Sequence, residues 1–314
     1  MAVLVLTQRF DATADVVIDE LNRRGVPLVR ADLGDLTVSA ELDGPRWTGV
    51  LAAEHHAVKL DDITGIYYRR PTNPTAPDGV SREVAEWIEA EQRWGLRGLL
   101  AALTRETWVN WPPAIHAAEH KPYQLAQAAD VGLSVPETLI TNDPDTAAEF
   151  ARRAKPVLYK AFRGNPVEID GEPRLVYATE VTAEQCRAES VRVAPVMLQH
   201  RIDKAFDARV TRVDDHVFAV IPRTESGAAP LDWRIDHAAN TWHPVEVPAD
   251  VRAGLLRLLD RLDLRFAACD FSVDHAGRWR FLEANPAGQW AWNHLLRDQI
   301  TAALANALTQ ETTP

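Results

Sequence analysis

The sequence has few cysteines and no long apolar run. Its 314 residues include two cysteines, Cys186 and Cys269, which lie far apart and outside any metal-ligand spacing. They exclude a disulfide framework and indicate a reducing, cytoplasmic compartment. No stretch approaches the roughly 18 consecutive apolar residues that a membrane-spanning helix needs, so we expect no membrane association. The apolar residues 2–7 lack a basic leader and a small-residue cleavage site, so we expect a strand there rather than a signal peptide.

Positive charge is also scarce. The chain has 34 Lys and Arg residues against 45 Asp and Glu residues, which gives a formal net charge of -11 at pH 7. A protein that binds nucleic acid needs a basic face to neutralise phosphates, so nucleic acid is not an expected partner. The rest of the composition, 46% hydrophobic and 25% charged, is typical of a globular protein. The length suggests two or three structural units.

The first 105 or so residues alternate between strand-like and helix-like patterns. A strand at 2–7, a helix at 13–25 and a strand at 26–31 predict a parallel sheet covered by helices. The further elements expected in this unit are a hairpin around Asp43-Gly44 with strands at 36–41 and 46–53, a strand at 64–69 and an amphipathic helix at 81–103.

Two further units are expected after residue 107. The middle unit should contain a strand and turn at 108–113, two helices around Lys121, a strand at 137–141, a helix at 145–154, a strand at 156–161 and a hairpin turn at Asp170-Gly171. The last unit is β-rich, with strands expected at 196–200, 207–213, 216–222, 267–273 and 279–284 and helices at 249–262 and 291–308. We therefore predict an α/β protein with domains at 1–107, 108–195 and 196–314.

Two carboxylates and an amide converge on the predicted C-terminal hairpin. Asp270 lies on one strand, and Glu283 and Asn285 lie two residues apart on the other. Side chains alternate in direction along a strand, so these three can share one face. Burial of Glu283 among apolar neighbours is costly unless something compensates its charge. Such oxygen ligands suit Mg²⁺ shared with nucleotide phosphates. The alternative is a surface hairpin with solvated charges.

This hairpin resembles a known family. Asp270 with Glu283-x-Asn285 is similar to the metal-binding end of ATP-grasp enzymes. The longer run from Phe281 to Trp290 resembles the ligases that mature ribosomal peptides of the microviridin or graspetide (ω-ester-containing peptide) group. Further similar segments are Tyr67–Thr72, Trp108–Pro112, His120–Pro122 and Gly132–Thr138. The resemblance implies an ATP-grasp fold, with an N-terminal domain followed by two domains that clamp ATP, and it implies ATP and Mg²⁺ as cofactors.

The resemblance also implies the nucleotide contacts. Lys121, beside a helix, and Lys160, at the end of an apolar strand, would hold the α- and β-phosphates. Gln199 and Ile202 would lie near the purine, in a segment that crosses between the two clamping domains. A lysine at the end of a buried strand usually has an anionic partner. The alternative for both lysines is a surface position, in which the aliphatic part of the side chain packs on apolar residues and the amine stays in water.

Two arginines are expected to act on the transferred group. By the resemblance, Arg209 would contact the phosphoryl group, a task that suits the planar fork of arginine. Arg234 would hold the acyl phosphate or the substrate carboxylate, or would form an ion pair with Asp232. Many ATP-grasp proteins have a glycine-rich loop after the second lysine, whereas residues 161–175 contain only two glycines. This departure favours the peptide ligases.

The predicted reaction is ring formation on a ribosomal precursor peptide, leader plus core. An Asp or Glu side chain of the peptide would become an acyl phosphate, which a Ser or Thr hydroxyl or a Lys amine would attack. Candidate peptide-binding residues are Tyr68, Arg69 and Arg70, together with the hairpin at 36–53, and the alternative for both arginines is an ion pair within the fold. The competing functions are a ligase for small amino-acid substrates and a non-catalytic nucleotide-binding protein. A symmetric homodimer is a reasonable expectation, since it is the commonest oligomer.

Overall fold

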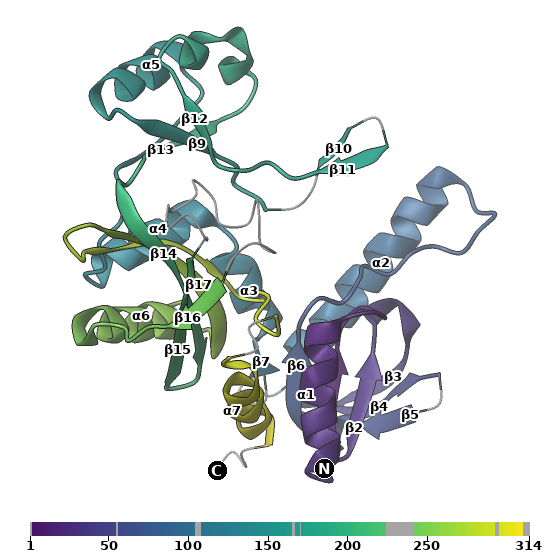
Figure 1. Ribbon diagram of the computed structural model, residues 1–314. Helices are drawn as coiled ribbons and strands as arrows, with labels where there is room; N and C mark the ends of the chain where they lie inside the picture. Colours follow the sequence, from purple (N-terminus) through teal and green to yellow (C-terminus); the bar gives the residue numbers. More distant parts are fainter. Residues whose placement is uncertain are drawn as a thin grey trace.

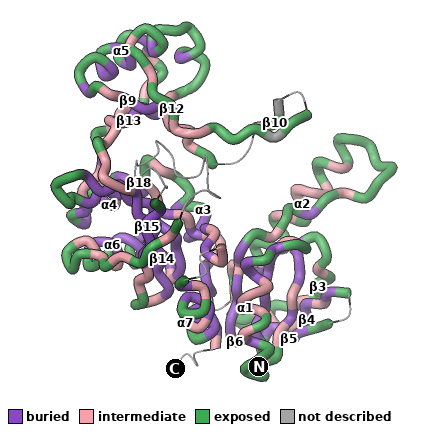
Figure 2. The backbone as a smooth tube through the Cα atoms, in the orientation of Figure 1, coloured by how far each residue is buried: buried purple, intermediate pink, exposed green. Residues whose placement is uncertain are grey.

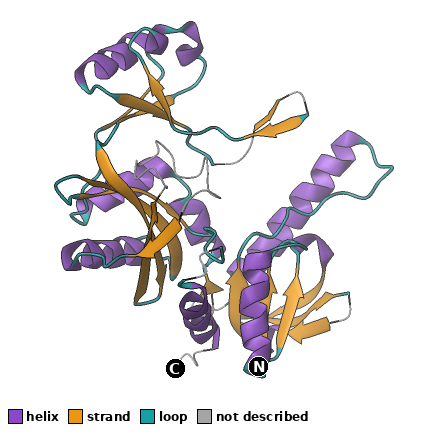
Figure 3. Ribbon diagram, in the orientation of Figure 1, coloured by secondary structure: helices purple, strands orange, loops and turns teal. Residues whose placement is uncertain are grey.

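Three bodies of helices and strands make up the molecule (Figure 1). The computed structural model describes residues 2–54, 56–103, 108–164, 167–169, 171–223, 241–292 and 295–309. Each body is built on its own sheet, and Figure 3 shows helices lying against each sheet. Within the described part of the chain, no helix combines the length and the apolar character that a membrane crossing requires.

The N-terminal body contains a parallel sheet of order β2-β1-β6-β7. Its strands are β1 (Ala2–Leu6), β2 (Leu28–Ala31), β6 (Ile63–Tyr68) and β7 (Trp108–Val109). The expected βαβ start is confirmed, with α1 (Ala12–Arg23) between β1 and β2. The Asp11 side chain starts α1 because it accepts hydrogen bonds from the N–H groups of Thr13 and Ala14. Past the end of α1, Gly25 adopts a φ of +71°, which glycine tolerates best.

Two further features extend this body. The expected hairpin is present as β3 (Leu36–Asp43) and β4 (Arg46–Ala53), and an unpredicted strand, β5 (His56–Lys59), pairs with β4 to make a small three-stranded sheet. The predicted amphipathic helix is α2 (Arg82–Ala101), which begins after the Ser81 cap. In Figure 1, α2 extends well beyond the sheet.

The middle body is an antiparallel sheet of order β12-β9-β13-β8. Its strands are β8 (Thr138–Thr141), β9 (Val157–Lys160), β12 (Thr179–Val181) and β13 (Val196–His200). Helix α5 (Pro144–Arg153) packs its alanines and Phe150 against this sheet. The strands β10 (Val167–Ile169) and β11 (Glu172–Arg174) pair antiparallel as a hairpin that extends from the body (Figure 1), while Asp170 of the predicted turn lies outside the described residues.

The C-terminal body is a five-stranded antiparallel sheet of order β16-β15-β14-β17-β18. Its strands are β14 (Lys204–Val213), β15 (His216–Arg223), β16 (Thr241–Pro244), β17 (Phe266–Asp274) and β18 (Trp279–Asn285). The helices α3 (Pro112–Ala118), α4 (Lys121–Asp130) and α6 (Ala249–Arg261) share one hydrophobic core with this sheet. Every residue of β17 is buried, so the strand that carries Asp270 lies at the centre of the body.

The last helix joins the N-terminal body to the C-terminal sheet. Helix α7 (Arg297–Thr309) contributes Ile300, Leu304 and Leu308 to a core that includes residues of β1, α1 and β17. The helix expected from residue 291 was wrong in its start, because residues 291 and 292 form a turn after the buried Trp290. The expected domain boundaries after residues 107 and 195 stay predictions.

Candidate active site

The predicted metal ligands lie together on one strand pair. In the antiparallel register of β17 and β18, Asp270 stands opposite Glu283, and Asn285 follows two residues later. The Asn285 Nδ2 atom lies 3.4 Å from Asp270 Oδ2 and 3.3 Å from Glu283 Oε1. Rotation of the amide by half a turn would present its Oδ1 to the same place. Two carboxylates and one amide oxygen therefore fit a hard cation such as Mg²⁺.

Each carboxylate has a cationic partner. Lys121 Nζ lies 2.9 Å from Glu283 Oε2 and donates to the Ala161 carbonyl at 3.0 Å. Arg209, opposite Asp270 in the register of β14 and β17, places Nη1 2.9 Å from both Asp270 oxygens. Buried charges are stable only when they are paired in this way. The cluster holds the two kinds of group that Mg²⁺ and nucleotide phosphates would each bind.

One cavity of about 240 Å³ brings most of the predicted nucleotide residues together. Its lining includes Lys121, Lys160, Gln199 and Ile202. The carboxylates of Asp270 and Glu283 line it as well, on the side of the C-terminal sheet. The cavity lies between the middle sheet and the C-terminal sheet, since its lining comes from β9, β13, β14, β17 and β18. Apolar side chains contribute as well, namely Leu158, Val176, Ala178, Phe271 and Leu282. This mixture suits a ligand with a flat apolar part and an anionic part.

Gln199 is held firmly within this cavity. Its side chain is buried, and its Nε2 atom donates to Thr138 Oγ1 at 3.0 Å across the pairing of β13 and β8. Lys160 is the last residue of β9 and stands opposite Met197 of the neighbouring strand β13. Both residues line the same cavity, and their contact with a nucleotide stays a prediction.

Among the residues that sequence reasoning missed is a polar group of three that line the cavity. Lys204 Nζ lies 2.5 Å from Asp207 Oδ2, and Ser272 Oγ donates to Asp207 Oδ1 at 2.7 Å. Asp207 precedes Arg209 by two residues on β14, and Ser272 follows Asp270 by two residues on β17, so each lies on the same face as its neighbour. The period of two along both strands was the signal that could have identified Asp207 and Ser272.

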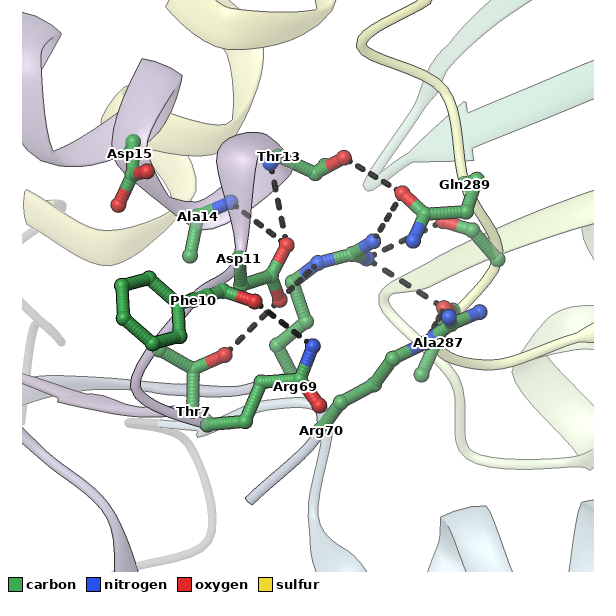
Figure 4. A network of polar contacts seen from close by, with 12 residues as sticks. Thr7, Phe10, Asp11, Thr13, Ala14, Asp15, Arg69, Arg70, Ala287 and Gln289 are labelled. Atoms are coloured by element: carbon green, nitrogen blue, oxygen red, sulfur yellow. Dashed lines mark hydrogen bonds and ion pairs between the residues drawn. The ribbon is translucent and has the colours of Figure 1, made fainter. Parts of the chain in front are cut away.

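Arg69 lies in a buried network rather than on a surface (Figure 4). Its side chain is 1% exposed and forms an ion pair with Asp11 Oδ2 at 2.9 Å. Its Nη2 atom donates to Gln289 Oε1 at 2.7 Å, and its Nη1 atom donates to the Gly288 carbonyl at 3.2 Å. The ion pair within the fold, which was the alternative for this arginine, is therefore the arrangement in the structure. Arg69 has no exposed surface to offer a peptide.

Asp11 is the anionic centre of the same network. Burial alone would raise the pKa of its carboxyl group, but Arg69, the hydroxyl of Thr7 and the N–H of Ala14 together hold that pKa below its ordinary value. Thr7 Oγ1 donates to Asp11 Oδ2 at 2.8 Å. The carboxylate thus stays charged, caps α1 and fixes Arg69 at once.

The other two candidate peptide-binding residues differ from Arg69. Arg70 is exposed, and its Nε atom donates to the Ala287 carbonyl at 3.1 Å. Tyr68 is half-buried, with its ring 6.1 Å from that of Trp108. Both stay candidates for contact with a peptide. Arg234 and Asp232 lie outside the described residues.

The loop after β18 connects this network to the metal site. The Gln289 side chain accepts hydrogen bonds from Arg69 and from Thr13 Oγ1, while its backbone carbonyl accepts from Arg209 Nη2 at 3.2 Å. Gly288 has no room for a side chain, because a Cβ atom there would lie 2.5 Å from Ala268 Cβ and 2.9 Å from Arg209 Nη2. These contacts give a physical reason for Gly288 and Gln289 in this loop.

Cys269 is not a nucleophile for this site. Complete burial raises the pKa of its thiol well above the ordinary value, so the group stays neutral and is shielded from substrate. What the described site does offer is a pair of cations, Lys121 and Arg209, that can bind and orient anionic groups.

Comparison with known proteins gives a family for the N-terminal part. Residues 2–116 match the model of the MvdD pre-ATP-grasp domain. This stretch includes Arg69 and Arg70 and ends within α3. No curated protein matches the chain in sequence.

Solved structures resemble the whole chain. Macrocyclase MdnC from Microcystis aeruginosa MRC, bound with the precursor peptide MdnA, is 25% identical, with a TM-score of 0.85 over 98% of this chain and 99% of that one. Macrocyclase MdnB from the same organism is 26% identical, with a TM-score of 0.80 over 98% and 99% of the two chains. A RiPP-associated ATP-grasp ligase from Chryseobacterium gregarium, in complex with ADP and a leader and core peptide, is 24% identical, with a TM-score of 0.87 over 100% and 98%.

These similarities extend across all three bodies, and the predicted fold is confirmed. The chain has the ATP-grasp fold, and its residues 2–116 match a pre-ATP-grasp domain of the MvdD type.

Proposed function

We propose that the chain is an ADP-forming ligase that makes rings in a ribosomal precursor peptide. It would activate Asp or Glu side chains of the core as acyl phosphates and join them to Thr or Ser hydroxyls, or to Lys amines, of the same peptide. The full-length similarity to macrocyclases MdnC and MdnB supports this function. The observation that carries it is the charge cluster of Asp270, Glu283, Arg209 and Lys121 beside a cavity of about 240 Å³ that Lys160 and Gln199 also line.

The cavity would hold ATP, with its purine near Gln199 and Ile202 and its phosphates near Lys121 and Lys160. Asp270, Glu283 and Asn285 would hold Mg²⁺, which, when bound, neutralises charge on phosphate oxygens. Arrival of phosphates and a cation would exchange partners within the cluster. Lys121 and Arg209 would turn from carboxylates to phosphate oxygens, and the carboxylates would be released to the cation.

Arg209 would then stabilise the phosphoryl group as it passes to the peptide carboxylate. The carboxylate oxygen forms a bond to the γ-phosphorus, the bond to the β-phosphate oxygen breaks, and ADP leaves. The peptide hydroxyl or amine next attacks the acyl carbon, loses its proton and expels phosphate. The enzyme contributes orientation and exclusion of water, since a solvated acyl phosphate would hydrolyse.

The N-terminal body would contribute to peptide recognition. Arg70, exposed beside the loop that follows β18, is placed to meet acidic groups of the peptide, and Tyr68 lies one residue away. The hairpin of β3 and β4 offers a second surface, with Leu42 and Val38 exposed. We also propose a cytoplasmic location, which the two unpaired, buried cysteines support.

The test is the intact mass of a candidate precursor peptide after incubation with the chain, ATP and Mg²⁺. A short, Thr-rich and Asp/Glu-rich peptide encoded beside the chain is the substrate to use. Each ring should remove the mass of one water molecule, and the Glu283→Ala variant should leave the peptide unchanged. If the peptide mass stays unchanged, and ATP is converted to ADP only when free amino acids are added, the chain would instead be a ligase for small substrates. Failure to form ADP with either substrate class would indicate a protein that only binds nucleotide.

A further inference from the structure

The carboxyl edge of the N-terminal sheet, where β1, β2 and β6 end, is built like a binding site. From β1 the chain passes through α1 to β2 on one side, while β6 pairs with β1 on the other side. The loops after β1 and β6 therefore separate from one another, and open parallel sheets bind their ligands at such a point. Figure 2 shows exposed segments among the loops at the ends of these largely buried strands.

Hydrogen bonds hold the loops of this edge in place. The N–H of Gln8 donates to the Arg70 carbonyl at 3.1 Å, which joins the loop after β1 to the loop after β6. The Gln8 carbonyl accepts from Arg30 Nη2 at 3.2 Å. Asp32, after β2, accepts from the N–H and from the hydroxyl of Thr72, both at 2.7 Å. A ligand that binds here would meet side chains on an ordered backbone, so little entropy would be lost by ordering the loops.

Arg70 presents an available guanidinium group at this edge. Its Nε atom donates to the Ala287 carbonyl (Figure 4), and among the described contacts neither of its Nη groups has a carboxylate partner. Partial removal from water and the positive charges of Arg69 and Arg209 lower the pKa of the Arg70 guanidinium. Arg70 therefore lies close enough to Arg209 for their charges to interact. A carboxylate that arrived beside Arg70 would compensate this excess of positive charge.

The loop after β1 adds an apolar and a cationic side chain. Phe10 is 84% exposed, and the guanidinium carbon of Arg9 lies 6.0 Å from the centre of its ring. Arg9 is exposed as well, and no carboxylate among the described residues pairs with it. Figure 4 shows the Phe10 ring turned away from the contact between Arg69 and Gln289. An exposed aromatic ring beside a cation, on a loop held by hydrogen bonds, is typical of an anchor in a protein interface.

We propose that the acidic core of the precursor peptide lies across this edge, with the carboxylate that is to be activated on Arg70 and flanking residues on Arg9 and Phe10. The inference rests on the ring-forming function proposed above. The two Nη groups of Arg70 can hold a carboxylate bidentately and orient it towards Arg209. Arg9 and Phe10, side by side, fit a segment that carries a second carboxylate next to an apolar side chain.

Binding of the fluorescently labelled precursor peptide to the chain loaded with ADP and Mg²⁺ tests the contact without any chemical step. Phe10→Ala and Arg9→Glu should each weaken binding about 10- to 30-fold, as loss of an interface anchor does. Val193→Ala, which changes an 85% exposed side chain of the middle body, and Arg152→Glu, which changes an exposed arginine of α5, should bind like the wild type. The affinity for ADP should be the same in all four variants.

Two exchanges separate direct contact from a structural effect. Arg70→Lys keeps the charge but loses the bidentate fork, so kcat/KM for ring formation should fall about 10-fold or more while the affinity for ADP is unchanged. In a scan of single Asp or Glu to Lys changes along the peptide core, one change should restore binding to Arg9→Glu and weaken binding to the wild type. Such a recovery requires that Arg9 and that peptide residue touch.

The outcomes separate this inference from the proposed function. If the wild type binds the peptide and forms no ring, the function fails, whereas weaker binding by Phe10→Ala and Arg9→Glu would still support the contact. If rings form and the Phe10, Arg9 and Arg70 variants all behave like the wild type, only this inference is overturned. Equal weakening of binding to the isolated leader segment would also overturn it, because the edge would then bind the leader. A wild type that binds no peptide would overturn both.

Discussion

The guanidinium group of Arg69 donates to the side-chain oxygen of Gln289 at 2.7 Å, between residues 220 positions apart in the sequence. Arg69 follows β6 of the N-terminal sheet, and Gln289 follows β18 of the C-terminal sheet. The carbonyl of the same glutamine accepts from Arg209, which holds Asp270. Four residues, Arg69, Gln289, Arg209 and Asp270, thus connect the N-terminal sheet to the candidate active site through hydrogen bonds.

Removal of the Arg69 guanidinium should destabilise the protein strongly. Arg69→Ala leaves Asp11 charged and buried without its cation, and loss of one partner of a buried pair costs about 3–5 kcal/mol. Arg70→Ala, at the exposed neighbouring position, should change the free energy of unfolding by less than about 0.5 kcal/mol. Denaturant-induced unfolding of the two variants and the wild type measures the difference. Equal effects of both substitutions would contradict the burial of Arg69.

The charge of Asp11 should give the stability a specific dependence on pH. Because its pKa in the folded chain is lowered, its contribution is present above its ordinary pKa of 3.8 and disappears as the pH falls through the folded value. The stability difference between wild type and Asp11→Asn should therefore be largest near neutral pH and vanish in acid. Unfolding free energies measured across this range check the prediction, with the more exposed Asp15→Asn as the control. A difference that persists in acid would mean that the Asp11 charge is not responsible.

Loss of the Gln289 side chain should impair catalysis more than nucleotide binding. Gln289→Ala frees the loop that places a carbonyl against Arg209, and a small displacement of a catalytic group costs up to about 100-fold in rate. We expect kcat for ADP formation to fall about 10- to 100-fold, with a smaller change in KM for ATP. Gln289→Glu keeps an acceptor for Arg69 and should recover part of the rate. Gln185→Ala, an exposed change in the middle body, serves as the control.

The carboxylates on β17 and β18 should be essential for the metal-dependent step. Asp270→Asn and Glu283→Gln preserve shape while they remove charge, and each should lower the rate of ADP formation by about 100-fold or more. Calorimetric titration with ADP should show that the Mg²⁺ needed for tight binding rises in both variants. Asp203→Asn changes an exposed carboxylate at the edge of the same cavity and should behave like the wild type. Unaltered Mg²⁺ dependence in Glu283→Gln would remove this residue from the metal site.

Cys269 should be chemically silent despite its position beside Asp270. Burial raises the pKa of its thiol, so iodoacetamide should not alkylate it in the folded chain at pH 8. Cys269→Ala should retain ring formation to within a few-fold, because no enzyme thiol is needed. Mass spectrometry of the treated protein and an activity assay of the variant check both statements. Rapid alkylation with loss of activity would require a covalent role.

Parts of the site could be predicted because they depend on short sequence patterns. The alternation of apolar and polar residues around Asp270 and Glu283 fixes a strand pair and a shared face, and the structure has this pair. The position of Lys160 at the end of an apolar strand could also be predicted from the local sequence. Residues 196–200 were predicted as a strand with the same bounds as β13.

Other parts depend on contacts between remote segments. The burial of Arg69 results from Asp11 and from Gln289, and nothing near Arg69 in the sequence indicates either partner. The short strands β5, β12 and β16 contain three or four residues each, and are strands because a neighbouring strand pairs with them. Helices α3 and α4 precede the middle sheet in sequence but pack on the C-terminal sheet, an arrangement that local patterns do not encode.

Gly65 on β6 has a consequence for any attempt to exchange N-terminal parts between related ligases. A Cβ atom at this position would lie 2.1 Å from the Leu308 carbonyl, so strand and terminal helix meet backbone to backbone. The N-terminal sheet therefore packs directly on α7, a helix near the other end of the sequence. A chimera that replaces residues 1–107 alone would join one parent's strand to the other parent's helix. A folded chimera should therefore require that the first domain and α7 be exchanged together.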